Sequence, residues 1–595
     1  MRFDSDFNIR YFISLLRNSK QWELLQDKTQ VFNERVNSDV KTRGSHSEDV
    51  ASIAEVLCRE LGADATTVSK AGLIGLLHDL GHIAYGHAGE SVAADYLENY
   101  SYTEQEQKEI FELRKLIYGE KYATENKKIT FEHNENSVLQ YLMLCKEHGF
   151  EPDKEIITGI LSHSTSRYKD LPPELYQQAV RLSDKIAYIN YDLQDLFLSF
   201  ENKPEELAAL KDMYDDPLKD PDGREIPIVL PDGRRITMID FVNLSTKEKI
   251  DMFVMEAVRD AKSQKMNPKG EYQNFDTILT GCNDIVVAMA SKKKAKKKAK
   301  TKEEKDSIQR EIDQLNRELY ERSPLLYAFY EVKNRSDEYI RTGKGLSEKS
   351  QAERTFNAES AVGNKDLMNE YIYKSTINYL KSQVELNREK SEEEIRASYQ
   401  NSGLDQEIVD FYFGFLDFQN EQNSMVASFP GNVNGYKFPE ICTIVNYVGT
   451  HSNSQLNSLA KKTGIVAKYE QEVKPLIELL TTSDILYDKS TGKLTKMGSS
   501  VRDMLIEHYG AKYKLSYGLE EEDVYPLTSD EVIEKLKEEG FEFEGEELSP
   551  EEKLDRFKTQ EKLSEMEVIK HIKGILNRKP IEMEAELTEE SGRTL

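Results

Sequence analysis

Apolar residues recur along most of the chain at the three- and four-residue spacing of amphipathic helices. The segment TTVSKAGLIGLLHDLG is apolar on nearly every side, which predicts a buried helix after a threonine cap. Similar helical patterns continue in SVAADYLENY, NSVLQYLMLCKEHG and ELYQQAVRLSDKIAYINYDLQDLF. One representative stripe is formed by Val50, Ile53, Ala54, Leu57 and Leu61. We therefore predict a mainly all-α protein.

A different pattern occupies residues 224–239, REIPIVLPDGRRITMI. Two short runs of β-prone residues flank the turn sequence PDG. We predict a small β-hairpin inserted in the helical protein.

Charge limits the partners that the surface can attract. The 80 basic and 107 acidic side chains give 80 − 107 = −27. Such a surface repels nucleic acid and polyanionic substrates unless cations are gathered locally. Residues 291–305, SKKKAKKKAKTKEEK, form such a run and lead into a segment with long-helix composition, whereas residues 518–565 are acidic. A solvated helix or linker is the simplest interpretation of both segments.

Nothing in the sequence predicts membrane insertion or secretion. No stretch approaches the roughly 20 apolar residues of a membrane span. The N-terminus also lacks the basic start and apolar run of a signal peptide. The four cysteines are far apart and have no metal-ligand spacing: Cys58, Cys145, Cys282 and Cys442. We expect a cytoplasmic protein with reduced thiols.

Histidine is concentrated in one part of the chain. Seven of the ten histidines lie within residues 46–163, namely His46, His78, His82, His87, His133, His148 and His163. His78 and Asp79 follow an apolar run at the end of a predicted buried helix, where unpaired polar groups cost several kcal/mol. A divalent cation removes that cost, because imidazole nitrogen and carboxylate oxygen are both good ligands. The sequence therefore predicts a metal site at this helix end.

A second polar row lies on a later helix. Asp184, Tyr188 and Asp192 are spaced i, i+4 and i+8, so they share one face, and apolar residues occupy other positions. Such a row faces either a polar cavity or water, and spacing alone leaves both open.

Three motifs together resemble a known family. TRGSHS, then HDLGHIAYGHAGE, then SDKIAY with a later aspartate are similar to the HD superfamily, whose signature is H…HD…D. The closer resemblance is to its deoxyguanosine triphosphate triphosphohydrolase (dGTPase) branch. It is clear over roughly residues 25–195 and fainter beyond. It implies an HD-domain helical core with helical extensions.

The resemblance implies a hydrolase that cleaves a dNTP to deoxynucleoside and tripolyphosphate, with dGTP as the default substrate. The implied metal ligands are His46, His78, Asp79 and Asp184. This nitrogen and oxygen set suits Mn²⁺, Fe²⁺, Co²⁺ or Mg²⁺. His87 and Glu90 would be the catalytic pair, since residues three apart on a helix face the same way.

The resemblance also implies residues that contact the substrate. His133 matches a further active-site histidine. Arg43 would clamp phosphate, because guanidinium binds phosphate bidentately. Lys185 matches a phosphate-binding lysine. The residues implied to read the sugar are Gln30, Tyr188 and Asp192.

The sequence departs from the family at Ile83-Ala84-Tyr85, where the bacterial branch usually has Pro-Pro-Phe. The base preference therefore stays open. Two alternatives remain: another HD phosphohydrolase, such as a nucleotidase or phosphodiesterase, and a nucleic-acid-binding or nucleotide-sensing regulator with a vestigial site. The family resemblance also implies a homo-oligomer. An allosteric nucleotide, or single-stranded DNA bound through the lysine run, is a further partner that the sequence leaves open.

We expect four regions. Residues 1–200 form the HD core with the metal and substrate site, and 201–290 form the insertion with the hairpin, which continues into core helices. Residues 291–345 hold the lysine-rich run and a long helix. A divergent helical C-terminal region with the acidic segment covers 346–595.

Overall fold

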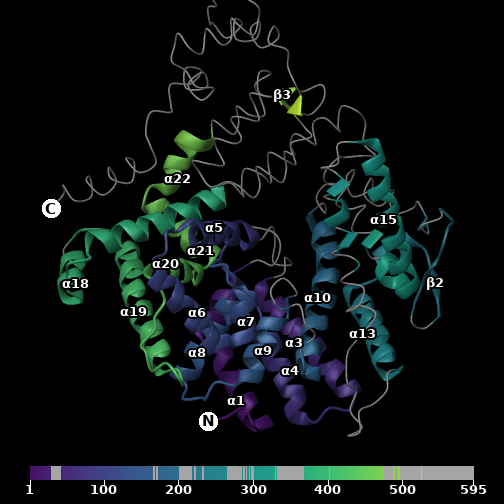
Figure 1. Cartoon of the computed structure of the whole chain (residues 1–595), viewed down its shortest axis with the longest axis horizontal. Coiled ribbons are helices and arrows are strands. Elements are labelled where there is room, and N and C mark those ends of the chain that lie inside the picture. Colours follow the sequence, from purple (N-terminus) through teal and green to yellow (C-terminus); the bar gives the residue numbers. More distant parts are fainter. Residues whose placement is uncertain are drawn as a thin grey trace, which may run out of the picture. The chain divides into compact units, whose positions relative to one another are not determined.

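A computed structural model shows a chain whose regular structure is mainly helical (Figure 1). The structure describes residues 1–28, 42–164, 168, 172–199, 217–219, 223–230, 233–263, 285, 288–289, 291–293, 295–296, 301–328, 330–331, 368–400, 402–474, 487–488, 493–495 and 524–525. It describes the backbone alone at 87–88, 188–199, 260, 263, 472–473 and in the strands beyond 474. The prediction of a mainly α-helical fold is confirmed.

The chain divides into two compact units. The first unit comprises Met1–His82, Arg114–Lys127 and His133–Leu346. The second comprises Ile83–Leu113, Lys128–Glu132 and Ser347–Leu595. The chain passes from the second unit back to the first within helix α6 (Glu104–Tyr118).

Helix α4 (Ala65–Leu77) is the central helix of the first unit, because α1, α3, α9 and α10 all pack against it. Its apolar side chains are buried on every side, as its sequence predicts. The predicted threonine cap is wrong. Asp64 is the N-cap and accepts a hydrogen bond from the backbone N–H of Thr67 at 2.8 Å. Aspartate is preferred over threonine at this position, so the helix begins earlier than expected.

The other helices of the first unit surround this centre or extend it. They are α1 (Asp6–Arg17), α2 (Lys20–Gln26), α3 (Arg43–Glu60), α7 (Glu120–Glu125), α8 (His133–Glu147), α9 (Lys154–Ser162), α10 (Leu175–Ser199), α12 (Met238–Asn243), α13 (Thr246–Ser263) and α15 (Lys302–Arg322). The long helix predicted after the lysine run is α15. Two lysines of that run contact it: Lys292 pairs with Glu311, and Lys296 donates to Gln309 at 2.6 Å.

The second unit is built around helix α19 (Gln406–Ser428), against which α18, α20 and α21 pack. Further helices of this unit include α5 (Gly86–Asn99), α18 (Glu392–Gln400), α20 (Glu440–Gly449), α21 (Asn453–Lys462), α22 (Ile465–Lys468) and the π-helix η1 (Tyr469–Val473). Aromatic rings fill the space between α19 and α20, where Phe411 and Phe415 lie 5.3 and 5.6 Å from Tyr447, measured between ring centroids. Helix α20 also packs against α5.

The predicted hairpin is present. Strand β1 (Ile228–Val229) pairs antiparallel with β2 (Arg235–Ile236), with Ile228 opposite Ile236. Gly233 of the turn has φ 86°, which glycine adopts without strain. A second small sheet was not predicted. In it, β4 (Lys493–Thr495) lies between antiparallel β3 (Tyr487–Asp488) and parallel β5 (Val524–Tyr525). These strands are too short to give a clear alternating pattern.

The described helices include none long and apolar enough to cross a membrane. Three of the four cysteines, Cys58, Cys145 and Cys442, are buried and form no disulfide, and Cys282 lies outside the described residues. Burial raises the pKa of the Cys58 thiol to about 12. This thiol is therefore protonated and unreactive near neutral pH.

A buried lysine closes the C-terminal end of helix α12. Lys249 of α13 donates from Nζ to the backbone oxygen of Val242 at 2.9 Å. The last carbonyl groups of a helix lack partners within the helix, so this bond satisfies one of them. Burial lowers the pKa of Lys249 to about 8, and the negative charge of Glu248 offsets only part of this effect.

This lysine makes stability depend on pH in a predictable direction. In the unfolded chain its pKa returns to about 10.4, so between pH 8 and that value the unfolded state binds more protons than the folded state. The free energy of unfolding should therefore rise with pH across this window, by about 3 kcal/mol. Lys249→Met should remove this rise in urea unfolding measured from pH 7 to 10. The exposed Lys247→Met is the control, and an equal loss in that variant would contradict the assignment.

Candidate metal and phosphate site

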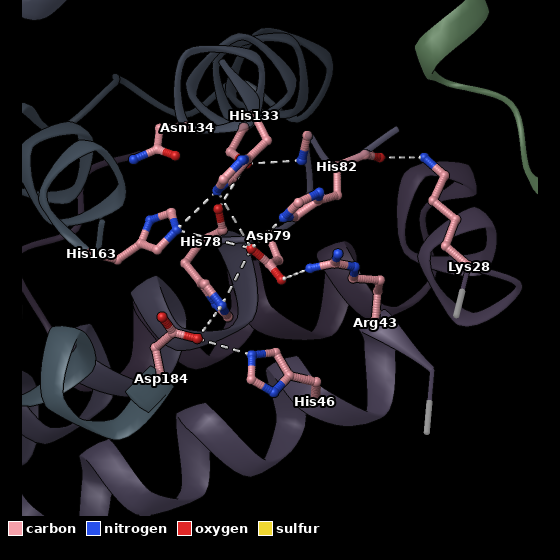
Figure 2. A network of polar contacts seen from close by, with 12 residues as sticks. Lys28, Arg43, His46, His78, Asp79, His82, His133, Asn134, His163 and Asp184 are labelled. Atoms are coloured by element: carbon pink, nitrogen blue, oxygen red, sulfur yellow. Dashed lines mark hydrogen bonds and ion pairs between the residues drawn. The ribbon is translucent and has the colours of Figure 1, made fainter. Parts of the chain in front are cut away.

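Two helices end in a histidine at the centre of the first unit. His78 ends α4 and His163 ends α9, each as the C-cap residue. In each ring Nδ1 bonds the backbone oxygen three residues earlier, at 2.7 Å to Gly75 and 2.6 Å to Ile160. These bonds fix Nδ1 as the donor, because a carbonyl oxygen only accepts. In the neutral ring each Nε2 is then an acceptor, and both rings point toward Asp79 in Figure 2.

The four predicted metal ligands lie close together. His46 comes from the first turn of α3, and Asp184 from α10. Oδ1 of Asp184 lies 3.0 Å from Nε2 of His46 and 3.6 Å from Nε2 of His78. Oδ1 of Asp79 lies 3.5 Å from the same nitrogen of His78. Three helices therefore bring two imidazoles and two carboxylates, distant in sequence, to one place.

These side chains fit a divalent cation. Nε2 of His78 is fully buried and has no hydrogen-bond partner among the described residues. An acceptor nitrogen without a partner is costly in a protein interior unless a cation or a proton binds to it. Ligand atoms of His46, His78 and Asp79 all lie within 4.8 Å of one another, close enough to share one ion. Nitrogen and oxygen donors without sulfur favour a borderline or hard cation.

The electrostatics of the cluster also favour a cation. Burial alone would lower the pKa of His78, but the charges of Asp79 and Asp184 outweigh it and raise this pKa to about 9. Burial would raise the pKa of both carboxyl groups, yet the surrounding histidines, together with Arg43 at Asp79, hold both pKa values well below the usual range. The two carboxylates are therefore charged near neutral pH and attract positive charge into a buried site.

Asp79 is the hub of a larger histidine cluster (Figure 2). Besides His78, three imidazoles approach its Oδ1 through Nε2: His82 at 3.3 Å, His163 at 3.9 Å and His133 at 4.0 Å. His82 stacks on His133, with ring centroids 3.9 Å apart, and Nε2 of His133 lies 3.3 Å from Nε2 of His163. Asp79 thus joins the predicted ligands to a second layer of imidazoles.

Neither His82 nor His163 was predicted from the sequence as a metal ligand or catalytic residue. A signal for His163 was present, because it ends an apolar helix in ILSH just as His78 does in GLLH. The shared C-cap position gives both rings the same bond to the preceding turn, as described above. Spacing along one chain cannot show that two such helix ends meet.

Glycine at position 81 allows the HD turn to contact helix α8 directly. The N–H of Gly81 donates to Oγ of Ser137 at 2.8 Å, and Asn136 donates to the oxygen of Gly81 at the same distance. Ser137 also donates to the backbone oxygen of His78. A Cβ at position 81 would lie 2.1 Å from the backbone N of Ser137 and 2.6 Å from the backbone O of His133. The turn that carries Asp79 is therefore locked to the helix that begins with His133.

Gly81→Ala should accordingly destabilise the first unit. The atoms in the way belong to backbone, which cannot move aside as a flexible side chain can, so we expect a loss of about 3 kcal/mol in the free energy of unfolding. Gly72→Ala on α4 is the matched control, because its Cβ would meet only the Glu55 side chain. Urea unfolding of both variants tests this, and equal stabilities would contradict it.

A buried ion pair supports the start of α8. Arg114 donates from Nε to Glu135 at 3.1 Å and from Nη1 to the backbone oxygen of Asn126 at 3.0 Å. The hydroxyl of Tyr122 donates to the other oxygen of Glu135 at 3.1 Å. Buried charges are stable when they are paired and hydrogen-bonded in this way. This network fixes the first turn of α8, in which His133 lies.

The predicted phosphate-binding residues lie in different surroundings. Arg43 is buried and donates from Nη1 to Oδ2 of Asp79 at 3.0 Å. Lys185 follows Asp184 on α10 and is half-buried. A cation not predicted from the sequence, Lys28, donates to the backbone oxygen of His82 at 2.6 Å, and burial together with the charge of Arg43 lowers its pKa to about 7.

Other predicted site residues are described only in part. Gln30 lies outside the described residues, as do the side chains of Tyr188 and Asp192, whose backbone belongs to α10. His87 and Glu90 belong to the second unit, on the first turns of α5, and Glu90 is half-buried. The side chain of His87 lies outside the description. The roles of these five residues stay predictions.

Comparison with known proteins gives an independent view of this region. A family model described as "HD domain" matches residues 43–189. A deoxyguanosinetriphosphate triphosphohydrolase-like protein of Caldanaerobacter subterraneus subsp. tengcongensis is 34% identical over 191 residues, which cover 32% of this chain and 46% of the relative. One of Clostridium tetani is 31% identical over 182 residues, covering 30% and 43%.

The similarity extends somewhat further in another relative of the same name. The protein of Ralstonia pickettii is 26% identical over 259 residues, covering 40% of this chain and 56% of the relative. The chain thus spans about half the length of these curated relatives. The residues that the family model matches include the histidine and aspartate cluster. Residues 43–189 of this chain are an HD domain.

Proposed function

We propose that this chain hydrolyses deoxynucleoside triphosphates to deoxynucleoside and tripolyphosphate with a divalent metal ion. The observation that carries the proposal is the convergence of His46, His78, Asp79 and Asp184 around the unpartnered Nε2 of His78. The names of the relatives support the substrate class, since each is called similar to a deoxyguanosine triphosphate triphosphohydrolase. The default substrate is therefore dGTP.

The metal ion, whether Mn²⁺, Fe²⁺, Co²⁺ or Mg²⁺, would polarise a phosphate oxygen and lower the pKa of water. Side chains of the protein would orient the substrate and transfer the proton. Water attacks the α-phosphorus and releases a proton to solvent, the bond from phosphorus to the sugar 5′-oxygen breaks, and that oxygen takes up a proton. We assign the role of proton donor to His87, and Glu90 would orient its ring. Proton transfer by a positioned side chain typically contributes 10²–10⁴-fold to the rate.

Charge explains why the site needs its own cations. The chain carries a net charge of −27, which opposes the approach of a triphosphate. Arg43 and Lys185 flank two of the proposed ligands, Asp79 and Asp184, and we propose that both contact phosphate oxygens. His133, whose Nε2 lies 4.0 Å from Oδ1 of Asp79, is proposed as a further active-site histidine. The sugar is proposed to be bound by Gln30, Tyr188 and Asp192.

The test is incubation of the purified protein with Mn²⁺ and each of the four dNTPs, followed by chromatography of the products. Deoxynucleoside with tripolyphosphate supports the proposal, and the relative rates give the base preference. Deoxynucleoside monophosphate with pyrophosphate would instead mean that the bond between the α- and β-phosphate groups breaks. Absence of product with every dNTP, with and without a second nucleotide as activator, would favour another HD substrate or a regulatory role. Chelation with EDTA should abolish any turnover that depends on the metal.

A further inference from the structure

Tyr85 has a backbone conformation that is unusual for a bulky residue. Its φ of 63° and ψ of 16° lie in the left-handed region, and it is the one non-glycine residue with positive φ in the described part of the chain. A side chain with a Cβ is strained in this region, so the surrounding structure must hold it there. Gly86, which follows, also has a positive φ of 54°. Two successive left-handed residues thus precede the body of helix α5.

Two asparagines of helix α21 hold Tyr85 in this conformation. The backbone N–H of Tyr85 donates to Oδ1 of Asn453 at 2.9 Å, and its hydroxyl donates to Oδ1 of Asn457 at 3.0 Å. The two asparagines are spaced i and i+4, so they lie on one face of α21. The tyrosine itself is 2% exposed, which leaves its ring little freedom to rotate. Helix α21 therefore fixes both the backbone and the phenolic hydroxyl of Tyr85.

The neighbouring residues are packed as tightly. A Cβ at Gly449, the last residue of α20, would lie 2.4 Å from Cγ2 of Ile83. A Cβ at Gly89 would lie 2.1 Å from the backbone oxygen of Ala84. Ile83 therefore packs closely against α20, and the carbonyl group of Ala84 packs closely against the start of α5. This close packing restricts the backbone of the turn to few alternative conformations.

The side chain of Tyr85, the N-cap residue of α5, makes no capping hydrogen bond to the first turn of that helix. Helices usually obtain a fixed first turn from a capping side chain, which satisfies their free N–H groups. The direction of the first turn of α5 therefore depends on the turn at Tyr85. That first turn and the next carry His87 and Glu90.

We propose that Tyr85 is a positioning residue, held by Asn453 and Asn457 of the C-terminal region so that α5 presents His87 and Glu90 in the catalytic orientation. This inference rests on the proposed function for the role of that pair. It assigns the second unit a part in the reaction, although the similarity to the curated relatives covers only part of the chain. The proposal also explains the tyrosine in the departing sequence Ile83-Ala84-Tyr85, since its phenolic hydroxyl donates the hydrogen bond to Asn457.

The central experiment is Asn453→Ala, which removes the acceptor for the backbone N–H of Tyr85. We expect kcat to fall between about 10- and 100-fold, because small displacements of a catalytic group have effects of that size. KM and the metal content per chain should be unchanged. Ser458→Ala is the matched control: it removes a 2.9 Å bond from the same helix to Glu407 without touching Tyr85, and should leave kcat unchanged.

Combination with Tyr85→Gly separates positioning from a general loss of structure. Glycine adopts the left-handed conformation without strain, so the turn no longer needs Asn453 to keep its shape. In the Tyr85→Gly background, Asn453→Ala should therefore cost less than about 3-fold in kcat. An equal loss in both backgrounds, or a loss accompanied by lower metal content, would overturn the proposal.

Amide hydrogen exchange provides a readout that does not depend on the substrate. In Asn453→Ala, exchange should accelerate at residues 86–90 and stay unchanged in α19 and α20. If the wild-type chain hydrolyses no dNTP, the proposed function fails, but this exchange pattern still supports the positioning of α5 by Tyr85. Unchanged exchange at 86–90, or faster exchange throughout the second unit, would overturn it whatever the activity.

Discussion

Asp79→Asn is expected to abolish metal binding and turnover together. The carboxylate of Asp79 lies within 4.0 Å of four imidazoles and pairs with Arg43 at 3.0 Å, so it joins five polar side chains of the cluster. Loss of an outer-shell partner commonly costs 10–100-fold in metal affinity or activity. Loss of a direct ligand should exceed about 100-fold in both.

Asparagine is chosen over alanine because of Arg43. That guanidinium is buried, and removal of the whole acceptor would leave its charge without a partner, at a cost of about 3–5 kcal/mol. Asparagine keeps an oxygen at the same place and removes only the charge, which separates metal binding from folding. Metal content by mass spectrometry of the native protein, turnover and thermal melting should be measured on the same preparation.

Asp64→Asn is the matched control for this variant. Asp64 lies at the other end of α4, where asparagine caps a helix as well as aspartate does. The control should therefore bind one ion per chain and keep its activity. Should Asp79→Asn still hold an ion as tightly as the wild type, the assignment of Asp79 as a ligand would be wrong.

The sequence was sufficient for those parts of the site that depend on local pattern. The apolar run before His78 predicted a buried helix ending at the HD pair, and the helix ends there. The row beginning at Asp184 predicted a carboxylate on a later helix facing either a polar cavity or water, and Asp184 lies beside His46 and His78. Both inferences use helical periodicity, which a sequence displays directly.

The parts that could not be predicted are contacts between distant segments. The contact of Arg43 with Asp79 was not predicted, because charge alone does not distinguish a phosphate from a carboxylate as its partner; its contact with phosphate stays a prediction. The meeting of His163 with His133 depends on how α9 approaches α8. Asn453 lies 368 residues from Tyr85 in a region where the family resemblance could not be followed. Tertiary packing alone brings these groups together.

The division of the chain into two units separates the proposed roles. All four proposed metal ligands belong to the first unit, and the proposed catalytic pair belongs to the second. A substitution in one unit can therefore affect metal binding or proton transfer separately. Variants of the metal cluster and variants of α5 should accordingly give different phenotypes, and the two can be distinguished in one assay of metal content and rate.

His87→Ala is expected to lower kcat by about 10²–10⁴-fold while the metal content stays at the wild-type level. The imidazole is proposed to donate the proton to the leaving 5′-oxygen, and alanine removes the donor without touching any proposed ligand. The products should be the same as those of the wild type, because the position of attack is set by the metal cluster. Single-turnover rates with dGTP and Mn²⁺ measure the chemical step directly.

Two further variants make this result interpretable. Glu90→Gln should have a smaller effect than His87→Ala, because it removes the group that orients the imidazole and leaves the imidazole itself. His148→Ala, which follows the C-terminal end of α8 and carries no proposed role, should retain full activity. A His87→Ala enzyme with an unchanged rate would remove His87 from the reaction. The metal site would still stand, and the search for the proton donor would turn to His133, which lies 4.0 Å from Asp79.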